Sequence, residues 1–174
     1  MSVGVHRIAD LVVNVADLLA HPGSSRPVEL EAVLDGLSIS ASRVPAGEPL
    51  SVAADLQAVN DAIVVKGHVR APWEGECRRC LQPATGSVEA EVQEIYERHP
   101  VDGETRKLED VIVDLTELAR DSILLELPLA PLCKDDCAGL CPSCGADKNS
   151  TGCECVTEVR DERWAALDDL RFDD

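Results

Sequence analysis

The 174-residue sequence predicts an α+β fold, in which an antiparallel β-sheet or partial barrel carries one main helix and a cysteine-rich C-terminal module. Three observations support this. Apolar residues alternate with polar or small ones over much of the first hundred positions, as in half-buried strands. A helical spacing follows at 114–127, and six of the eight cysteines come after it. We therefore expect a β-rich domain at 1–130 and a module at 131–174 that ends in a helix.

The strands follow from this alternation and from the turn signals between apolar runs. The clearest pair is a hairpin, because apolar residues occupy every second position at 50–58 and again at 63–69, with Asn60-Asp61 as the turn. Proline and glycine cluster at 22–27 and 45–49, where we expect loops. In chain order, strands are expected at 8–15, 28–40, 50–58, 63–69 and 88–96.

The main helix is predicted at 114–127. Asp114 and Glu117 are spaced as in a capping box, and apolar residues then recur at helical spacing. Pro128 disfavours helical backbone at the residue before it, so the helix should end near Leu127. This helix leads directly into the cysteine run.

Two further segments are interpreted from their polarity. The polar stretch at 100–109 is expected to be an exposed, mobile loop. In the tail, a short amphipathic stripe at helical spacing is expected to pack on the chain's own core in preference to a partner helix. The stripe consists of Trp164, Leu167 and Leu170.

The cysteines are the least random feature of the chain. An upstream pair, Cys77-x2-Cys80, precedes the run Cys133-x3-Cys137-x3-Cys141-x2-Cys144-x8-Cys153-x-Cys155. Eight thiols are the number that closes two four-thiolate metal sites. The alternative is a disulfide framework of the kind found in small secreted domains.

The N-terminal sequence argues against secretion, and therefore against disulfides. The apolar stretch at 3–20 is interrupted by Arg7, Asp10, Asn14 and Asp17, which leaves no continuous signal-peptide core. No segment approaches the roughly 20 apolar residues of a membrane span. A chain of 174 residues can also bury a core without covalent cross-links. We expect a cytoplasmic protein, without membrane association, whose thiols bind metal.

Zinc explains the spacing of the downstream thiols as well as their number. A tetrahedral ion with Zn–S bonds of about 2.3 Å requires thiolates on short, tightly turned segments. Between Cys141 and Cys144, Pro142 presets φ, and Gly145 can adopt φ > 0 where backbone N–H groups turn toward sulfur. This segment therefore predicts a zinc knuckle.

The other cysteines fit a zinc site less specifically. The upstream pair resembles a second knuckle, although Leu81 replaces the usual glycine. Cysteines two apart share a face of an extended segment, and cysteines four apart share a face of a helical turn. These spacings apply to Cys153 with Cys155 and to Cys133 with Cys137. All eight are candidate ligands, for two zinc ions.

All-cysteine ligation indicates structural zinc. Catalytic zinc keeps an open position and usually recruits histidine or a carboxylate. None of the four histidines lies near a cysteine in sequence, and no His-x-Glu precedes a Pro-Cys-x-x-Cys, which argues against a nucleobase deaminase. We identify no catalytic residue and expect no enzyme.

A thiol-based redox or zinc-sensing protein is the alternative function. Arg78 and Arg79 would lower the pKa values of the upstream thiols, which favours thiolate. A thioredoxin-like pair should open a helix after a strand. Here turn signals surround the pair instead, at Pro72, Gly75, Gln82 and Pro83.

The charge balance argues against direct binding of naked nucleic acid. The chain carries 16 Lys+Arg against 33 Asp+Glu, a net charge of −17, and residues 89–126 alone hold twelve acidic and four basic side chains. Nucleic-acid footprints are normally basic. Only 2% of residues are aromatic, which leaves few stacking platforms, and Trp73 is expected to cover the core beside the metal. The acidity is explained by a solvated surface or, more specifically, by a basic protein partner.

Several stretches also resemble one known family. They are Glu76-Cys-Arg-Arg-Cys-Leu81, the helix from Asp114-Leu115 to Leu127-Pro128, Cys133-x3-Cys137-Ala-Gly-Leu-Cys-Pro-Ser-Cys-Gly145, Asn149 before Cys153-Glu-Cys155, and Asp161-Glu-Arg-Trp-Ala-Ala-Leu167. The chain resembles the YceD family, described as large ribosomal RNA subunit accumulation proteins of bacteria and plastids. The match runs from residue 50 to the C-terminus, and the first fifty residues match only in outline.

The resemblance implies a ribosome-assembly factor that promotes accumulation or maturation of large-subunit (23S) rRNA on the pre-50S particle. It supplies no catalytic activity. It also implies a division of the thiols, because relatives with fewer cysteines keep the upstream pair but lack the downstream tetrad. One site would consist of Cys77, Cys80, Cys133 and Cys137, which ties the module to the sheet, and the other of Cys141, Cys144, Cys153 and Cys155.

The resemblance and the charge together imply a partner. Genes of the family often lie beside that for ribosomal protein L32, so L32 or another basic ribosomal protein or assembly factor is the expected first contact. Ribosomal RNA would then be reached only within that complex. The candidate contacts to rRNA or to the partner are basic side chains near the cysteines, Arg78, Arg79, Lys134 and Lys148.

Overall fold

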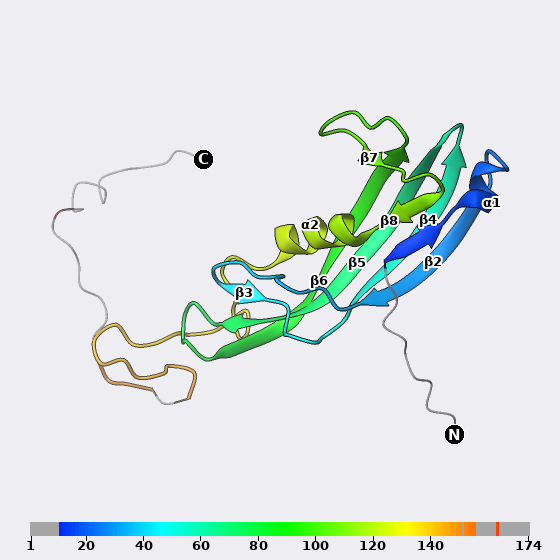
Figure 1. Cartoon of the computed structure of the whole chain (residues 1–174). Coiled ribbons are helices and arrows are strands. Elements are labelled where there is room, and N and C mark those ends of the chain that lie inside the picture. The colour runs from blue at the N-terminus through cyan, green and yellow to red at the C-terminus, as the bar shows by residue number, and fades with distance from the viewer. Residues whose placement is uncertain (1–10, 151, 156–162, 164–174) are drawn as a thin grey trace, which may run out of the picture.

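The computed structural model describes residues 11–150, 152–155 and 163, and its main element is an elongated, curved sheet (Figure 1). The sheet comprises β2 (Ser25–Ala32), β3 (Ser42–Arg43), β4 (Leu50–Val59), β5 (Ala62–Glu76), β6 (Pro83–Glu97) and β7 (Arg106–Lys107). The strand order is β2-β4-β5-β6-β7, with β3 paired to β5 off this path.

The sheet is mixed and open, which refines the predicted antiparallel sheet or partial barrel. Its pairs are antiparallel except β6 with β7, which is parallel. In the described chain β2 and β7 are the two edge strands and do not pair with each other, so the sheet does not close into a barrel. A two-stranded sheet and two helices complete the described elements: β1 (Val12–Asn14), β8 (Ile112–Asp114), α1 (Ala16–Leu19) and α2 (Thr116–Glu126).

The β4–β5 hairpin forms as the alternation predicts. Every second residue of β4 is buried, from Leu50 to Ala58. Val59 pairs with Ala62 across the turn, where Asn60 has a φ of 53°. Asparagine is one of the few residues that adopt this left-handed conformation readily. The sequence therefore predicted both the pairing and the face that is buried.

The β5–β6 hairpin is longer than predicted, and the turn expected around Pro72 is wrong. β5 continues through Glu76, which pairs with Pro83 at the start of β6. The other edge of β5 pairs with β4 as far as Arg70 and with β3 from Glu74 onward. Pro72 lies between them, where no neighbouring strand requires its missing N–H. The extension carries the upstream cysteine pair beyond the end of β4.

The N-terminal strand predicted at 8–15 is shorter in the structure and lies outside the large sheet. Residues 1–10 fall outside the described part, and β1 pairs with β8. Val13 and Val113 are opposite each other in this pair, and both are buried. The small sheet therefore covers the core.

The strand predicted at 28–40 is displaced toward the N-terminus. β2 begins inside the loop predicted at 22–27 and ends before residue 33. Pro27 is accommodated because β2 is an edge strand, one side of which needs no N–H donor. The loop predicted at 45–49 contains no helix or strand, as expected.

The segment at 100–109 is only partly the predicted exposed loop. Its first five residues are exposed, but β7 joins the sheet beside β6 and Leu108 is 2% exposed. The buried side chain of Leu108 and the pairing of β7 therefore hold the second half of this polar segment on the fold.

The α2 helix ends as predicted but begins differently. Leu115 is its N-cap residue, and the Oδ1 atom of Asp114 accepts a hydrogen bond from the backbone N of Thr116 (2.8 Å), so the capping box with Glu117 is not formed. Asp114 still belongs to β8, which places its carboxylate beside the first turn. The helix ends at Glu126, two residues before Pro128. Its buried residues follow the predicted spacing: Leu118, Ala119 and Ile123.

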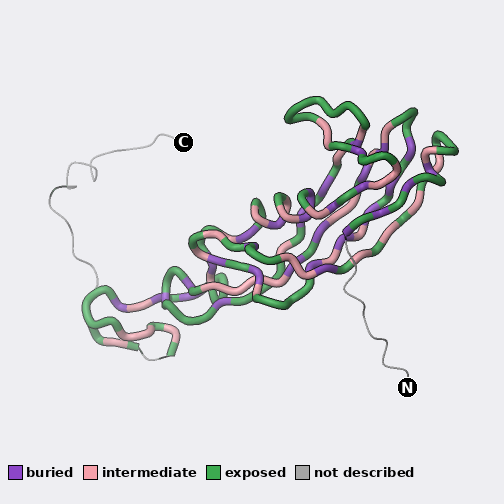
Figure 2. Tube along the Cα trace, in the orientation of Figure 1, coloured by how far each residue is buried: buried purple, intermediate pink, exposed green. Residues whose placement is uncertain are grey.

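One core lies between the inner face of the sheet and the elements that cover it. α2 packs on β5 and β6, and Figure 2 shows buried residues in α2 and in the strands of the sheet. Trp73 packs against both this core and the buried upstream cysteines, the position predicted for it. The C-terminal helix and the Trp164, Leu167 and Leu170 stripe fall outside the described residues. Among those described, no helix has the length and apolar character to cross a bilayer.

Candidate metal centres

The first cysteine cluster forms at the end of the β5–β6 hairpin. Cys77 and Cys80 lie in the loop between these strands, and the chain after α2 brings Cys133 and Cys137 to them. The four sulfur atoms lie within 4.8 Å of one another. The Sγ–Sγ distance is 3.7 Å from Cys77 to Cys137 and 3.5 Å from Cys80 to Cys133. All but Cys133 are buried.

Two hydrogen bonds guide the chain after α2 to this hairpin. The buried Ser42 donates from Oγ to the carbonyl oxygen of Pro128 at 2.9 Å. The backbone N of Arg78 donates to the carbonyl oxygen of Pro131, also at 2.9 Å. Because both acceptors precede Cys133 by a few residues, the sheet itself positions the downstream thiols of the first cluster.

The second cysteine cluster is local. Cys141, Cys144, Cys153 and Cys155 lie with their sulfur atoms within 4.8 Å of one another. Cys141 is buried, whereas Cys144 and Cys155 are exposed. Both groups of four coincide with the division that the family resemblance implied.

The two cysteine turns share one backbone pattern. In the first, Cys77 N donates to Gln82 O and Leu81 N donates to Cys77 O. In the second, the equivalent bonds run from Cys141 N to Ala146 O and from Gly145 N to Cys141 O. All four bonds measure 2.8–2.9 Å.

The fifth residue of each turn adopts a left-handed conformation. Gly145 has a φ of 75°, as predicted for a knuckle glycine. Leu81 has a φ of 61° at the same position and is 60% exposed. A leucine pays a steric cost in this region that glycine avoids. Nothing in the sequence beyond the Cys-x2-Cys spacing signalled that Leu81 would take this conformation.

The sulfur geometry fits a tetrahedral metal ion. Four thiolates at Zn–S distances of about 2.3 Å have sulfur–sulfur separations of about 3.8 Å. The two Sγ–Sγ distances of the first cluster, 3.7 and 3.5 Å, lie close to this value. They are far longer than the roughly 2.05 Å of a disulfide. The described cysteines are accordingly free thiols, and each cluster could hold one ion.

Electrostatics in the first cluster favour one thiolate over its neighbours. Burial opposes ionisation of Cys77, but backbone N–H groups of Cys133, Cys80 and Arg79 outweigh it and lower the pKa of Cys77 to about 6. The hydrogen bond with Cys80, followed by burial, raises the pKa of Cys133 to about 12. Crowded thiols therefore cannot all ionise unless a cation compensates their charge.

The second cluster shows the same division. Backbone N–H groups of Cys144 and Ser143, together with the Cys153 thiol, lower the pKa of Cys141 to about 6. Hydrogen bonds with Cys144 and Cys141 raise the pKa of Cys155 to about 12. In both turns backbone N–H groups thus lower the pKa of the first cysteine.

The basic residues predicted as contacts all lie near the clusters, but they differ in their surroundings. The Nη1 atom of Arg79 donates to the carbonyl oxygens of Cys137 (2.9 Å) and Asp135 (3.3 Å), so this guanidinium holds the first cluster's loop. Lys134 forms an ion pair with Asp136 at 3.8 Å. Arg78 and Lys148 are exposed. The contact role of all four residues stays a prediction.

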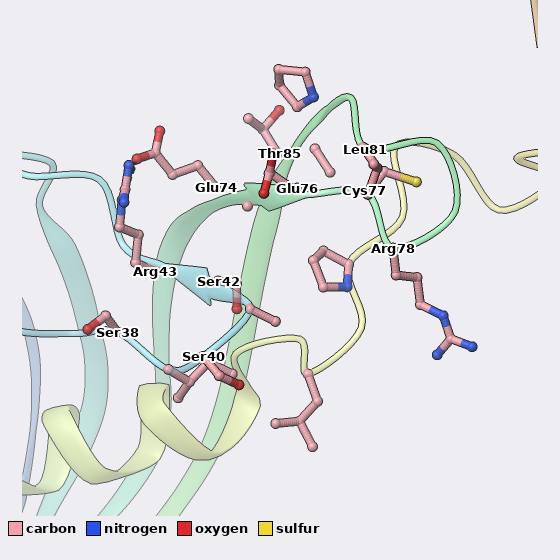
Figure 3. Close-up of a pocket in the computed structure, with 17 residues that line it drawn as sticks. Ser38, Ser40, Ser42, Arg43, Glu74, Glu76, Cys77, Arg78, Leu81 and Thr85 are labelled. Atoms are coloured by element: carbon pink, nitrogen blue, oxygen red, sulfur yellow. Dashed lines mark hydrogen bonds and ion pairs between the residues drawn. The ribbon is translucent and has the colours of Figure 1, made fainter. Parts of the chain in front are cut away.

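A groove with a volume of about 840 Å³ adjoins the first cluster (Figure 3). It is lined by the 38–43 segment, the end of β5, the start of β6, and the exposed side chains of Leu81 and Leu129. Glu74 on its wall is paired with Arg43, whose Nε atom lies 2.8 Å from Oε1. Its lining includes no histidine. The groove is therefore a recess in the surface, without a paired base and nucleophile.

Asn149 is a further candidate for the metal site, and the sequence marked it only through the family resemblance. Its Nδ2 atom donates to Cys137 Sγ at 3.4 Å, although it lies nearer to the second cluster in sequence. No spacing pattern predicts that a single asparagine between cysteines will contact a metal ligand. Only the folded chain shows the contact.

Comparisons with known proteins identify one family model and several relatives. Residues 65–171 match the family model described as "Large ribosomal RNA subunit accumulation protein YceD". An uncharacterized protein of Mycobacterium tuberculosis (strain ATCC 25618 / H37Rv) is 30% identical over 172 residues, which cover 93% of this chain and 82% of the relative. An uncharacterized protein of Mycobacterium leprae is 29% identical over 150 residues, covering 80% of this chain and 68% of the relative.

A plant protein shows a shorter match. The "Large ribosomal RNA subunit accumulation protein YCED homolog 1, chloroplastic" of Arabidopsis thaliana is 34% identical over 59 residues, which cover 34% of this chain and 18% of that protein. No solved structure matches the chain.

Proposed function

Because this chain belongs to the YceD family, we propose that it is a non-enzymatic ribosome-assembly factor that promotes accumulation or maturation of large-subunit (23S) rRNA. The family description itself names large ribosomal RNA subunit accumulation. The observation that carries the proposal is the extent of the match. Residues 65–171 include most of β5, all of β6 and α2, and all eight cysteines.

Depletion of the protein tests this role directly. The ratio of mature large-subunit to small-subunit rRNA should fall in depleted cells, and free small subunits should accumulate in ribosome profiles. Re-expression of the intact chain should restore the ratio. An unchanged ratio with normal profiles would contradict the assembly role and favour the sensing alternative.

Zinc is the ion we propose for both clusters, with a structural role. All-thiolate tetrahedral sets suit zinc or iron, and the two closed groups of four leave no ligand position for a substrate. Purified protein should carry close to two zinc ions per chain by mass spectrometry of the metals, with few reactive thiols before denaturation. A metal-free, disulfide-bonded preparation from a reducing cytosol would contradict this proposal.

The zinc sites also define how we propose to divide the chain. Residues 1–130 form the β-rich domain, and residues 131–174 form the cysteine-rich module. The first cluster would join them, because Cys77 and Cys80 come from the domain and Cys133 and Cys137 from the module. The second cluster would stabilise the module alone.

A basic protein is the first contact that we propose on the pre-50S particle, in the cytoplasm. Exposed acidic residues on β6 and α2, such as Glu91, Glu117 and Glu126, support this charge preference. Ribosomal protein L32 is the leading candidate, and rRNA would be reached within the complex through Arg78, Arg79, Lys134 and Lys148. Attraction of this kind weakens as salt screens it.

A binding experiment separates protein-first from RNA-first contact. The metal-loaded protein should bind L32 with a salt-dependent affinity and bind isolated large-subunit rRNA fragments weakly near physiological salt. Tight, sequence-selective binding to naked rRNA, lost in Arg78→Ala, would show that local basic geometry overcomes the net charge of −17. Lys66→Ala, in the part of β5 remote from the cysteine turn, is a matched charge control.

The alternative function, a thiol-based redox or zinc sensor, is favoured by one observation. Cys144 and Cys155 of the second cluster are exposed, so oxidants and chelators could reach them. A sensor would lose zinc reversibly at physiological oxidant concentrations and change its binding partners as it did so. An assembly factor with structural zinc would keep the same partners under those conditions.

A further inference from the structure

A short hairpin connects the two cysteine clusters. Its two sides meet at a β-bridge between Leu140 and Asp147, and Lys148 N donates to Gly139 O at 2.9 Å. On the opposite edge, Leu140 N donates to Arg79 O at 3.0 Å. The segment at 138–140 is therefore bonded on one side to the first cluster's turn and on the other to the chain that leaves the second cluster's turn.

The side chain of Asn149 extends this connection to a sulfur atom of the first cluster. Its Oδ1 atom accepts a hydrogen bond from Ala138 N at 2.9 Å. Its Nδ2 atom donates to Asp147 Oδ1 at 2.7 Å and to Cys137 Sγ at 3.4 Å. Because Ala138 N can only donate, the amide oxygen must face it, and both amide hydrogens are then used.

Asp147 fixes the position of this amide. Its Oδ1 atom accepts from the backbone N of Asn149 at 2.9 Å as well as from Nδ2. The amide is thus held at both ends and half-buried beside the buried Cys137. Such groups orient metal ligands and tune their charge, and their replacement commonly weakens metal binding.

We propose that Asn149 is a positioning residue for the metal ion of the first cluster and that it couples the two metal sites. An N–H donor disperses the negative charge of a Cys137 thiolate and fixes the orientation of this ligand, which slows release of the ion. Asn149 lies between Cys144 and Cys153 of the second cluster, so metal bound there would hold the chain in the path that brings this amide to Cys137. Metal at the second site therefore strengthens metal binding at the first, and thermodynamic linkage requires the reverse effect to be equal.

The proposal rests on the metal binding proposed above and is independent of the rRNA role. Zinc transfer from the fully loaded chain to the chromophoric chelator 4-(2-pyridylazo)resorcinol provides the first test. Asn149→Leu, which removes both N–H donors, should speed zinc release from the first cluster by about 10–100-fold. Ser150→Ala is the matched control, since Ser150 lies on the same hairpin but bonds only to Asp147 O, and it should leave release unchanged.

The double variant Cys141→Ser/Cys144→Ser tests the coupling without altering Asn149. It should bind one zinc ion and release it as fast as Asn149→Leu releases its first-cluster ion. Adding Asn149→Leu to this background should have little further effect, because the amide is no longer held in place.

Cadmium-113 NMR of the fully loaded protein distinguishes a direct contact from general loosening. Asn149→Leu should shift the resonance of the first cluster and leave that of the second unchanged. Unchanged first-cluster release in both Asn149→Leu and the double variant would overturn the coupling but leave the metal sites standing. A chain that binds no metal at the first cluster would overturn both.

Discussion

The first cysteine cluster draws its sulfur atoms from segments 53 and 60 residues apart, whereas the second takes all four from residues 141–155. Three thiols of the first cluster are buried against Trp73 and the end of the hairpin. In the second, only Cys141 is fully buried. Each cluster thus consists of four thiols, but the first connects segments distant in sequence and the second is local.

The comparison shows that two metal sites with the same ligands can contribute differently to the stability of the fold. Both turns have the same backbone hydrogen bonds, and in both the first thiol has a pKa of about 6. The difference lies in what the ion would hold together. In the first cluster it would fasten the chain after α2 to the sheet, and in the second it would hold a single hairpin and its continuation.

The largest predicted effect comes from removing one ligand at the equivalent position of each turn. Cys80→Ser should lose one zinc ion and lower the Tm by about 8–16 °C, because the loss of a metal that joins distant segments belongs to the most destabilising class of changes. Cys144→Ser should also lose one ion but lower the Tm of the sheet by less than half as much. Calorimetry with metal analysis measures both, and equal decreases would remove the distinction between the clusters.

A smaller effect is predicted for the two neighbouring arginines of the first turn. Arg79→Ala removes the hydrogen bonds to the carbonyl oxygens of Cys137 and Asp135 and should lower the free energy of unfolding by about 1 kcal/mol. Arg78→Ala should change it by less than about 0.5 kcal/mol, because its backbone bond to Pro131 remains. Denaturant unfolding at saturating zinc measures both. A larger loss for Arg78→Ala would mean that the structural role of the two residues is reversed.

The smallest effect should have opposite signs in the two turns. Leu81→Gly relieves a left-handed leucine and should raise the free energy of unfolding by about 0.5 kcal/mol, since glycine's greater freedom in the unfolded chain offsets part of the gain. Gly145→Ala places a Cβ atom at a φ of 75° and should weaken the second turn, which amide hydrogen exchange at 141–146 would report as faster opening. Effects of the same sign would show that the two turns are not equivalent.

Local sequence patterns predicted those parts of the fold that are determined by contacts between residues close in sequence. Alternation gave both strands of the β4–β5 hairpin, and Pro128 gave the end of α2. The errors arose where the conformation of a residue depends on a neighbour that is distant in sequence. Pro27 and Pro72 lie in strands because the neighbouring positions do not require their N–H groups, and this depends on which strand lies beside them.

The same distinction applies to the candidate site. The spacing of the cysteines predicted turns and metal ligation in general, and Gly145 predicted its own conformation. Spacing did not determine which four thiols converge, and that division came from the family resemblance. The contact between Asn149 and Cys137 depends on the path of the hairpin. The left-handed conformation of Leu81 belongs to a turn closed by local backbone hydrogen bonds, which a leucine at that position does not signal.

The separation of Cys80 from Cys133 has a consequence for the order of events during synthesis of the chain. The upstream pair leaves the ribosome 53 residues before its partner thiols, so it remains an open dithiol while β6, β8 and α2 are made. Closing so long a loop costs more chain entropy than closing a short one, so we expect those elements to fold before the first cluster closes. The second cluster needs only a short loop and can take up its ion as soon as its last thiol appears. An ion in the first cluster would therefore mark a completed sheet, whereas an ion in the second would mark only that translation has passed Cys155.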